Sequence, residues 1–562
     1  MFLESTFLPA GEADRKRWGQ VNTTSLACAL AHSLNKASEF WLIVTPNTAN
    51  AYRLYEELTF FSAKHKKYIS IFPDWEILPY DSFSPHEDII SERIGVLSSL
   101  PTQTHGALIV ALPTLCHRLA PRSFISGNSL QIKIGDTLDL DSLRLKFSRA
   151  GYRMVDNVYE HGEFAIRGAI LDVFPMGMAQ PVRIEFFDTD IETLRTFDPE
   201  TQRSNESLQK IDLLPGREFP FQESSIRTFK AQWLEEFGKP PAHCQIYQDI
   251  EAGLVPSGIE YYLPLFFDET SSLIDYLPDN TKLAMPSNIT DLAGQFLNDT
   301  QIRHYEYNID RRRPLLAPEK VLLRQTELLE KLKPYPGSLY SEDALAEKPG
   351  RINFDSNSHH SFQVQPKADH PWQSLIQHIQ GQAAQGIATL LLAESPGRQE
   401  YLIEKLQPAF QQAKLGDLKP LLDWDQVLTT SFKVGILVGP LTNGIILRTR
   451  ELEIICEQQL FGTTRVAQSR RRTTSNHINP DHIIRDLTEL RIGAPVVHID
   501  HGVGRYEGLQ TFDLTGQPEE FCTLSYAHNT KLYVPVSSLH CIARYTGGDE
   551  ETAPLHRLGN EQ

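Results

Sequence analysis

Residues 18–34, WGQVNTTSLACALAHSL, form an expected strand-to-helix junction, where many nucleotide-binding proteins place a phosphate-binding loop. Such a loop has the pattern G-x-x-x-x-G-K-[ST]: its amides surround the phosphates, its lysine neutralises them and its hydroxyl binds magnesium. Gly19 can supply the first glycine, but Thr24 and Ser25 stand where the second glycine and the lysine belong. The stretch contains no lysine at all. The sequence therefore predicts a degenerate nucleotide loop without nucleotide chemistry.

A second candidate site is VVHIDHGVGRYEGL at residues 496–509, which could be a nucleotide cradle, a metal site or a surface for another protein. His498 and His501 lie three apart in an expected strand, so their side chains point to opposite faces and suit one metal ion poorly. Gly502 and Gly504 lack the helix that follows a dinucleotide-binding fingerprint. We expect these glycines to supply positive φ or tight curvature at a barrel corner.

No other residues form a recognisable catalytic set. The sequence contains no G-x-S-x-G motif, and FFDET at residues 266–270 resembles an acidic magnesium motif so faintly that we expect a surface turn. The six cysteines are far apart and form no C-x-x-C pair, which argues against a zinc site and a disulfide framework. We therefore expect no catalytic residues and no metal site in this chain.

Length and charge favour a large protein-binding platform. The 562 residues are too many for one core and predict three to five domains. The net charge of −17 disfavours binding of phosphate backbones by the chain as a whole. The sequence has no run of eighteen apolar residues and no secretory signal, so we expect no membrane span and a cytosolic location.

The first 125 residues alternate expected strands and helices, which predicts an α/β sheet layer. FWLIVTP (40–46), YISIF (68–72) and ALIVAL (107–112) are short apolar runs typical of buried parallel strands. A helix should follow the first run, with Asn47 or Thr48 as its N-cap.

Residues 126–215 form an expected β-rich unit. VYEHGEFAIRGAILDVFP should be two strands joined by a turn at His161-Gly162, and a second hairpin should turn at Asp188-Thr189-Asp190. Alternation in the strand 182–187 places Phe187 beside Arg183 on the face opposite the core.

An exposed aromatic residue next to arginine is typical of a binding hot spot, although Phe187 could instead pack under a neighbouring loop. Arg167 lies within the apolar strand AIRGAIL and also needs a partner.

The remaining chain contains four further segments. Residues 216–345 should be mixed and more helical, and a second, small α/β unit should span 352–460. Residues 461–479 are polar and basic and predict a flexible linker, in which the triple arginine is either solvated or a phosphate contact. Several short strands between 480 and 548 predict a small barrel.

Two long motifs carry a resemblance to a known family. DWEILPYDSFSPHEDIISERIGVLSSL (74–100) and AGYRMVDNVYEHGEFAIRGAILDVFPMG (150–177) closely resemble the N-terminal half of the bacterial transcription-repair coupling factor. GAPVVHIDHGVGRYEGL and KLYVPVSSLHCIARYTGG resemble the RNA polymerase-interacting domain of the same family, a Tudor/SH3-like β-barrel. The resemblance covers nearly the whole chain.

This resemblance implies a multi-domain α/β architecture. A RecA-like, excinuclease-B-like module comprises domain 1a (1–125), an inserted β-rich domain (126–215) and domain 1b (216–345). A small α/β domain of unknown role (352–460), the linker (461–479), the Tudor/SH3-like barrel (480–548) and the start of a connection to a motor (549–562) then follow.

The resemblance also implies partners and site residues. The β-rich domain would bind the excinuclease A subunit through Arg167, Arg183 and Phe187. The barrel would bind the RNA polymerase β subunit, with Ile499 as an apolar contact, so that 496–509 is a docking strand and turn.

The family continues into two ATP-driven domains that translocate on double-stranded DNA, so we expect this chain to be an N-terminal fragment. No cofactor is then expected in the fragment, whereas ATP and Mg are expected for the full-length family. The resemblance thus implies an adaptor in transcription-coupled nucleotide-excision repair. Two alternatives stay open: an excinuclease-B-type ATP-dependent DNA helicase, and a free-standing transcription regulator that uses only the barrel.

Overall fold

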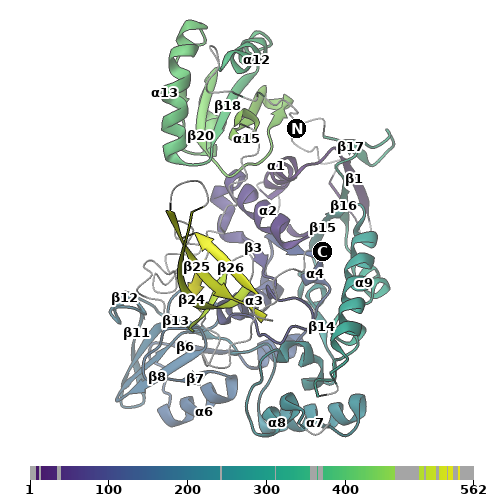
Figure 1. Cartoon of the computed structure of the whole chain (residues 1–562), viewed down its shortest axis with the longest axis vertical. Helices are drawn as coiled ribbons and strands as arrows, with labels where there is room; N and C mark the ends of the chain where they lie inside the picture. Colours follow the sequence, from purple (N-terminus) through teal and green to yellow (C-terminus); the bar gives the residue numbers. More distant parts are fainter. Residues whose placement is uncertain are drawn as a thin grey trace. The chain divides into compact units, whose positions relative to one another are not determined.

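The computed structural model describes residues 8–9, 11, 14–34, 39–240, 243–310, 312–354, 362, 364, 371–461, 493–498, 502–513, 518–527, 530–535 and 542–544. The chain forms two compact units, Met1–Arg465 and Val466–Gln562. In Figure 1 the first unit runs from purple to green, and the described strands of the second are yellow.

The first unit is built on a seven-stranded parallel sheet with the order β17-β1-β16-β15-β2-β4-β3. Its strands are β1 (Arg15–Gly19), β2 (Phe40–Thr45), β3 (Ile69–Phe72), β4 (Gly106–Ala111), β15 (Thr281–Pro286), β16 (Gly337–Tyr340) and β17 (Arg351–Asn353). Every residue of β2 and β4 is buried, which explains their continuous apolar sequences and confirms the predicted parallel strands.

Helices cover both faces of this sheet (Figure 1). Alternate residues of β2 separate the two cores: Trp41 and Ile43 pack in one, and Phe40, Leu42 and Val44 pack in the other. The first core contains α1 (Thr23–Leu34) and α2 (Thr48–Phe61), and the second contains α3 (Glu87–Ser99), α4 (Leu112–Leu115), α9 (Ile289–Tyr307) and α11 (Gln325–Leu332). As predicted, Asn47 caps α2 by accepting a hydrogen bond from the backbone N–H of Asn50.

A six-stranded β-rich sheet with the order β12-β11-β10-β9-β8-β7 follows. Its strands are β7 (Arg153–Met154), β8 (Glu163–Arg167), β9 (Ile170–Val173), β10 (Val182–Phe187), β11 (Asp190–Phe197) and β12 (Ser204–Ser207), and β6 (Leu130–Lys133) pairs separately with β13 (Lys210–Leu213). The predicted hairpin turn at His161-Gly162 is wrong: that turn precedes β8, and the hairpin turns at Gly168, which has a φ of 62°. The second hairpin turns at Asp188 and Thr189, as predicted.

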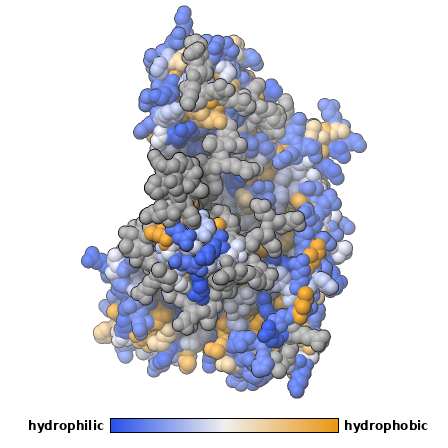
Figure 2. Space-filling model, in the orientation of Figure 1, coloured by the Kyte–Doolittle hydropathy of each residue, from blue (hydrophilic) through white to orange (hydrophobic). Residues whose placement is uncertain are grey.

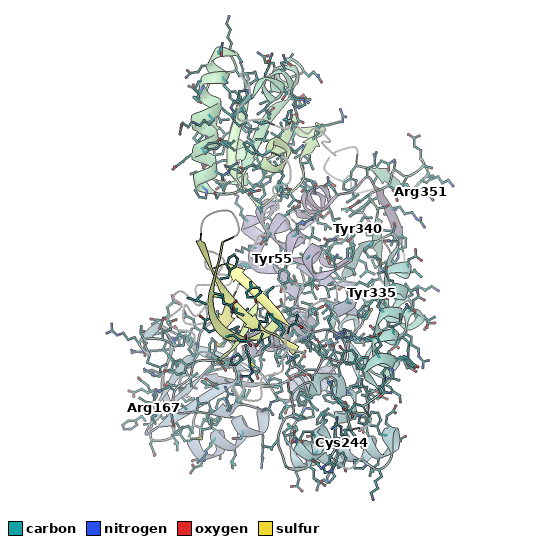
Figure 3. All side chains as sticks on the ribbon, viewed as in Figure 1. Tyr55, Arg167, Cys244, Tyr335, Tyr340 and Arg351 are labelled. Carbon is teal, nitrogen blue, oxygen red and sulfur yellow. The ribbon has the colours of Figure 1, made fainter. Side chains whose placement is uncertain are left out.

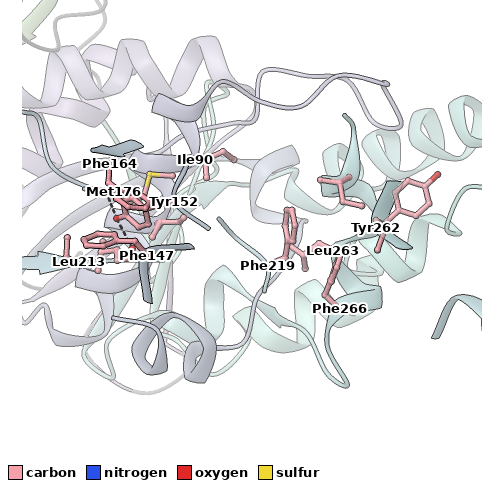
Figure 4. Packing of buried hydrophobic residues seen from close by; sticks show 14 of the residues in the cluster. Ile90, Phe147, Tyr152, Phe164, Met176, Leu213, Phe219, Tyr262, Leu263 and Phe266 are labelled. Carbon is pink, nitrogen blue, oxygen red and sulfur yellow. Dashed lines mark hydrogen bonds between the residues drawn. The ribbon is translucent and has the colours of Figure 1, made fainter. Parts of the chain in front are cut away.

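One hydrophobic core joins this sheet to the helical segment that follows it. Phe147 of α6 (Leu140–Ala150) and Phe164 of β8 belong to the same cluster as Trp233 of α7 (Glu223–Phe237) and Phe266 of the 3₁₀ helix η4 (Ile259–Phe266). Ile250 of α8 (Gln245–Glu251) completes it. Figure 4 shows part of this packing, in which the hydroxyl of Tyr152 accepts a hydrogen bond from the Met176 N–H at 3.2 Å.

A third sheet lies in residues 371–461 and has the order β19-β20-β18-β22-β21. Its elements are α12 (Gln373–Ala384), β18 (Ala388–Ala393), α13 (Pro396–Gln412), β19 (Lys419–Pro420), α14 (Trp424–Thr429), β20 (Val434–Val438), β21 (Ile445–Leu447), β22 (Leu452–Cys456) and α15 (Glu457–Phe461). One face packs on α12 and α13 in a core of its own. The other face, with Leu390 and Ile454, shares the core of α1 and α2.

The second unit contains a five-stranded antiparallel sheet with the order β26-β25-β24-β23-β27. The strands are β23 (Pro495–His498), β24 (Gly502–Asp513), β25 (Pro518–Ser525), β26 (Lys531–Pro535) and β27 (Ile542–Arg544). Val496, Tyr506 and Tyr526 are among the residues of its small core. Across the described parts of both units, no helix has the length and apolar content needed to cross a membrane.

Candidate protein-docking site

The β-rich sheet presents the three residues that the sequence singled out on one of its faces. In β10, Val182, Ile184 and Phe186 are buried in the core, as alternation predicts. Phe187 is 75% exposed, so it does not pack under a neighbouring loop. Figure 3 places Arg167 on this sheet, at the lower left, and Figure 2 shows hydrophobic side chains among hydrophilic ones over the same region.

A buried carboxylate joins the two arginines. Asp172, in the middle of β9, pairs in register with Arg183 of β10. Its Oδ1 accepts a hydrogen bond from Arg183 Nε at 2.7 Å, and its Oδ2 accepts one from Arg183 Nη2 at 3.0 Å. Arg167 Nη2 also donates to Oδ2. The side chain of Asp172 is 1% exposed, so these bonds supply the charge pairing that a buried carboxylate requires.

Arg183 is largely enclosed by the sheet. Its guanidinium lies over the ring of Phe197, 4.9 Å from the centroid, and its Nη1 donates to the Gln202 carbonyl at 3.2 Å. The hydrogen bond with Asp172 raises the pKa of Arg183 above its ordinary value. With 15% of its side chain exposed, Arg183 faces its own domain more than the solvent.

Arg167 and Phe187 are the members that solvent can reach. Arg167 is 43% exposed, and its Nη1 donates to Asn157 Oδ1 at 2.8 Å. Phe187 lies one residue beyond Phe186, whose N–H donates to the Ala169 carbonyl in the turn after β8. The guanidinium of Arg167 and the exposed ring of Phe187 lie at the same end of one sheet and form a surface suited to protein recognition.

The degenerate loop predicted near Gly19 lies at the start of α1. Gly19 ends β1, and a β-carbon placed on it would lie 2.3 Å from Asn353 Oδ1, so the backbone is closely covered there. Asn22 and Ser25 cap the helix reciprocally: Ser25 N–H donates to Asn22 Oδ1 at 2.8 Å, and Asn22 N–H donates to Ser25 Oγ at 2.9 Å. The helix start that would bind phosphate in a nucleotide site is thus satisfied by protein groups.

The third sheet reaches the same helix start. Thr24 Oγ1 accepts a hydrogen bond from the Asn443 N–H at 3.4 Å. Next to it, Glu57 of α2 is fully buried and accepts bonds at Oε1 from the N–H and the hydroxyl of Thr442, at 3.1 and 2.9 Å. Burial raises the pKa of Glu57, and the hydrogen bonds from Thr442 and Thr24 oppose that shift.

Aromatic packing extends this junction. Trp424 of α14 meets Phe61 and Phe60 of α2, with ring centroids 4.8 and 5.8 Å apart. Lys64 forms an ion pair with Asp425 at 2.9 Å. The contacts attach residues 371–461 to α1 and α2 as one packed body, which the sequence did not predict.

The predicted polymerase contact Ile499 lies outside the described residues, as do His501 and residues 462–479 of the predicted linker, whose first residue, Phe461, instead ends α15. Of the two roles expected for Gly504, positive φ or tight curvature, the structure excludes the first, because Gly504 is not among the residues with positive φ. A β-carbon there would lie 3.0 Å from the ring of Tyr526, so close packing requires the glycine. Among the described residues, no group of three or more His, Cys, Asp or Glu side chains could hold a metal ion.

Comparison with known proteins identifies three of these segments. Residues 130–219 match the family model described as UvrB interaction domain, and they contain the face formed by Arg167, Arg183 and Phe187. Residues 384–460 match the MFD D3 domain, and residues 490–546 match the CarD-like/TRCF RID domain.

Relatives match almost the entire chain. A transcription-repair-coupling factor of Haemophilus influenzae is 40% identical over 561 residues, which are 99% of this chain and 47% of that protein. The factor of Escherichia coli is 39% identical over 558 residues, again 99% and 47%. That of Myxococcus xanthus is 28% identical over 509 residues, which are 87% and 41%. The chain spans about half the length of these relatives.

Together, the folds and these matches define a multidomain α/β protein with a UvrB-type interaction domain, an MFD-type third domain and a CarD-like domain. Over the part of those proteins that it spans, the chain is similar to transcription-repair-coupling factors.

Proposed function

We propose that this chain is the adaptor part of a factor for transcription-coupled nucleotide-excision DNA repair. In this function the second unit binds the β subunit of an RNA polymerase stalled at a DNA lesion, and the β-rich sheet recruits the excinuclease A subunit. The observation that carries the proposal is the presence in one chain of a UvrB interaction domain and a CarD-like/TRCF RID domain.

The finer assignments are part of the same proposal. The antiparallel sheet of the second unit is the scaffold of a Tudor/SH3-like barrel that docks through Ile499. Arg167, Arg183 and Phe187 form the excinuclease A-binding face. ATP, Mg and double-stranded DNA belong to the translocating domains of the full-length family, which release the polymerase. The capped start of α1 and the absence of a lysine at Thr24-Ser25 speak against an excinuclease-B-type helicase in this part.

The proposal is tested by capturing this chain on immobilised RNA polymerase and then adding the excinuclease A protein. The parent should hold both proteins in one complex. Ile499→Arg should abolish polymerase binding, because it buries an unpaired charge, and should retain excinuclease A binding. Phe187→Ala should weaken excinuclease A binding and retain polymerase binding. If each variant affects both partners alike, or if neither affects its own partner, the division of labour between the two units is wrong.

A further inference from the structure

We propose that Asp172 is a positioning residue of the excinuclease A-binding face, and that Arg183 acts through it, so that Arg167 and Phe187 make the contacts with the partner. This inference rests on the proposed function and assigns different roles to residues that the sequence grouped together.

The first argument is the arrangement of donors around Asp172. Both of its oxygens are used: Arg183 engages them with Nε and Nη2 at 2.7 and 3.0 Å, in the two-pronged geometry that fixes a guanidinium against a carboxylate. Arg167 shares Oδ2. Since Asp172 is held inside a sheet whose backbone is paired on both sides, it gives the Arg167 side chain a fixed point of attachment.

The second argument compares how much of each arginine side chain a partner protein can reach. All three guanidinium nitrogens of Arg183 donate hydrogen bonds within its own domain: Nε and Nη2 donate to Asp172, and Nη1 donates to the Gln202 carbonyl. Its guanidinium also lies over the ring of Phe197. It is 15% exposed, against 43% for Arg167. A partner can therefore reach the outward side of Arg167 much more readily than any polar atom of Arg183.

The third argument concerns charge. Asp172 and Arg183 form a neutral pair, and Glu185, on the same face, accepts a hydrogen bond from the Thr193 hydroxyl at 2.7 Å. Arg195, which pairs in register with Arg183, is also exposed, but the cation at the end of the sheet where Phe187 lies is that of Arg167. We expect its counterpart on the excinuclease A protein to be a carboxylate next to an apolar recess that receives the Phe187 ring.

Two near-isosteric changes separate positioning from direct contact. Asp172→Asn removes a negative charge close to an acidic counterpart, so electrostatics alone would tighten binding. Positioning predicts at least tenfold weaker binding, because the amide can accept only part of the hydrogen bonds that hold the two arginines. Arg183→Lys keeps the positive charge and loses the two-pronged geometry, so it should also weaken binding at least tenfold.

The experiment measures the dissociation constant for immobilised excinuclease A protein at several salt concentrations, with the full chain and its variants. Arg167→Ala should weaken binding and also reduce its salt dependence. Asp172→Asn and Arg183→Lys should have little further effect when Arg167 is already alanine, because they act through it.

Two controls test whether the variants fold. The first is urea unfolding of each variant, and the second is the double variant Asp172→Asn/Arg183→Gln, which leaves no unpaired buried charge. That double variant should fold and still bind weakly. Binding at parental strength by Arg183→Lys, or tighter binding by Asp172→Asn, would overturn the inference while leaving the proposed function intact. Absence of binding by the folded parent would instead refute the proposed function, and the inference with it.

Discussion

Thr442 donates both its backbone N–H and its hydroxyl to Oε1 of Glu57, a carboxyl that is buried completely between α2 and the third sheet. The two residues are 385 positions apart in the chain. A buried carboxyl is costly without hydrogen bonds, and Glu57 receives two of them from Thr442 only while residues 371–461 are docked on α1 and α2. The third domain is thus part of the core of the first unit.

Replacement of Trp424 tests this docking. Trp424→Ala removes the ring that packs on Phe60 and Phe61, and large-to-small changes of buried tryptophan cost about 3–5 kcal/mol. We expect limited proteolysis to cleave between the third domain and the rest much faster than in the parent. Trp372→Ala is the matched control, since Trp372 packs in the separate core of the third domain. Equal cleavage of the two variants would contradict docking through Trp424.

Loss of Arg183 should destabilise the β-rich sheet strongly. Arg183→Ala leaves the buried carboxylate of Asp172 with Arg167 as its remaining charged partner, and breaking a buried ion pair costs about 3–5 kcal/mol. Arg167→Ala should cost about 1 kcal/mol or less, because Arg167 is more exposed and the two bonds from Arg183 stay in place. Urea unfolding measures both values, and a cost for Arg167→Ala that equals that for Arg183→Ala would show that the two arginines support Asp172 equally.

Phe187→Ala should affect binding without affecting folding. Its ring is 75% exposed, so its removal should change the free energy of unfolding by less than about 0.5 kcal/mol. Binding to the excinuclease A protein should weaken by about 1–4 kcal/mol, as expected for a hot-spot aromatic. Leu422→Ala is a suitable control, because Leu422 is 83% exposed and lies outside the β-rich sheet. Titration of both variants on immobilised excinuclease A protein measures the two dissociation constants. A loss of affinity of similar size for both would show that Phe187 does not contact the partner.

The stability of the first unit should fall between about pH 5 and pH 8 through Glu260. Burial raises the pKa of Glu260 from 4.5 to about 8, and its Oε2 accepts a hydrogen bond from the Ser84 hydroxyl at 2.9 Å. In this pH range the folded state keeps a proton that the unfolded state has lost, so each rise in pH favours unfolding.

Glu260→Gln should remove that dependence and gain up to about 4 kcal/mol over the parent at pH 8. Urea unfolding of both proteins at pH 5.5, 7 and 8.5 measures the difference. Curves that stay parallel across this range would show that Glu260 is ionised in the folded protein.

Sequence patterns located the candidate docking face but not its organisation. Alternation in β10 was sufficient to place Phe187 outside and Ile184 inside, because one face of that strand is buried. Asp172 went unnoticed, since a single acidic residue in an apolar strand gives no sign of which arginines will reach it. The sequence did offer one indication: Asp172 lies between Leu171 and Val173, which face the core, so alternation places Asp172 on the opposite face of the strand.

Other features depend on contacts between distant segments. His161-Gly162 and Gly168 both offer a glycine with positive φ, and only the pairing of β8 with β9 decides which one turns the hairpin. The α/β pattern of residues 352–460 was visible, whereas the sharing of its second sheet face with α1 and α2 required the structure. Ile499 stays a prediction.

The reciprocal cap between Asn22 and Ser25 has an evolutionary consequence. Ser25 occupies the position at which a phosphate-binding loop needs lysine, and it also supplies the hydroxyl that accepts from Asn22 N–H. A mutation to lysine would therefore remove one of the two capping hydrogen bonds, the one from Asn22 N–H to Ser25 Oγ, before any nucleotide could compensate for its loss. Reversion also needs a glycine at Thr24, whose hydroxyl is already engaged by Asn443. Each of the two changes that would create a phosphate-binding loop thus first removes a hydrogen bond of the folded protein, so the start of α1 opposes its own conversion into a nucleotide site.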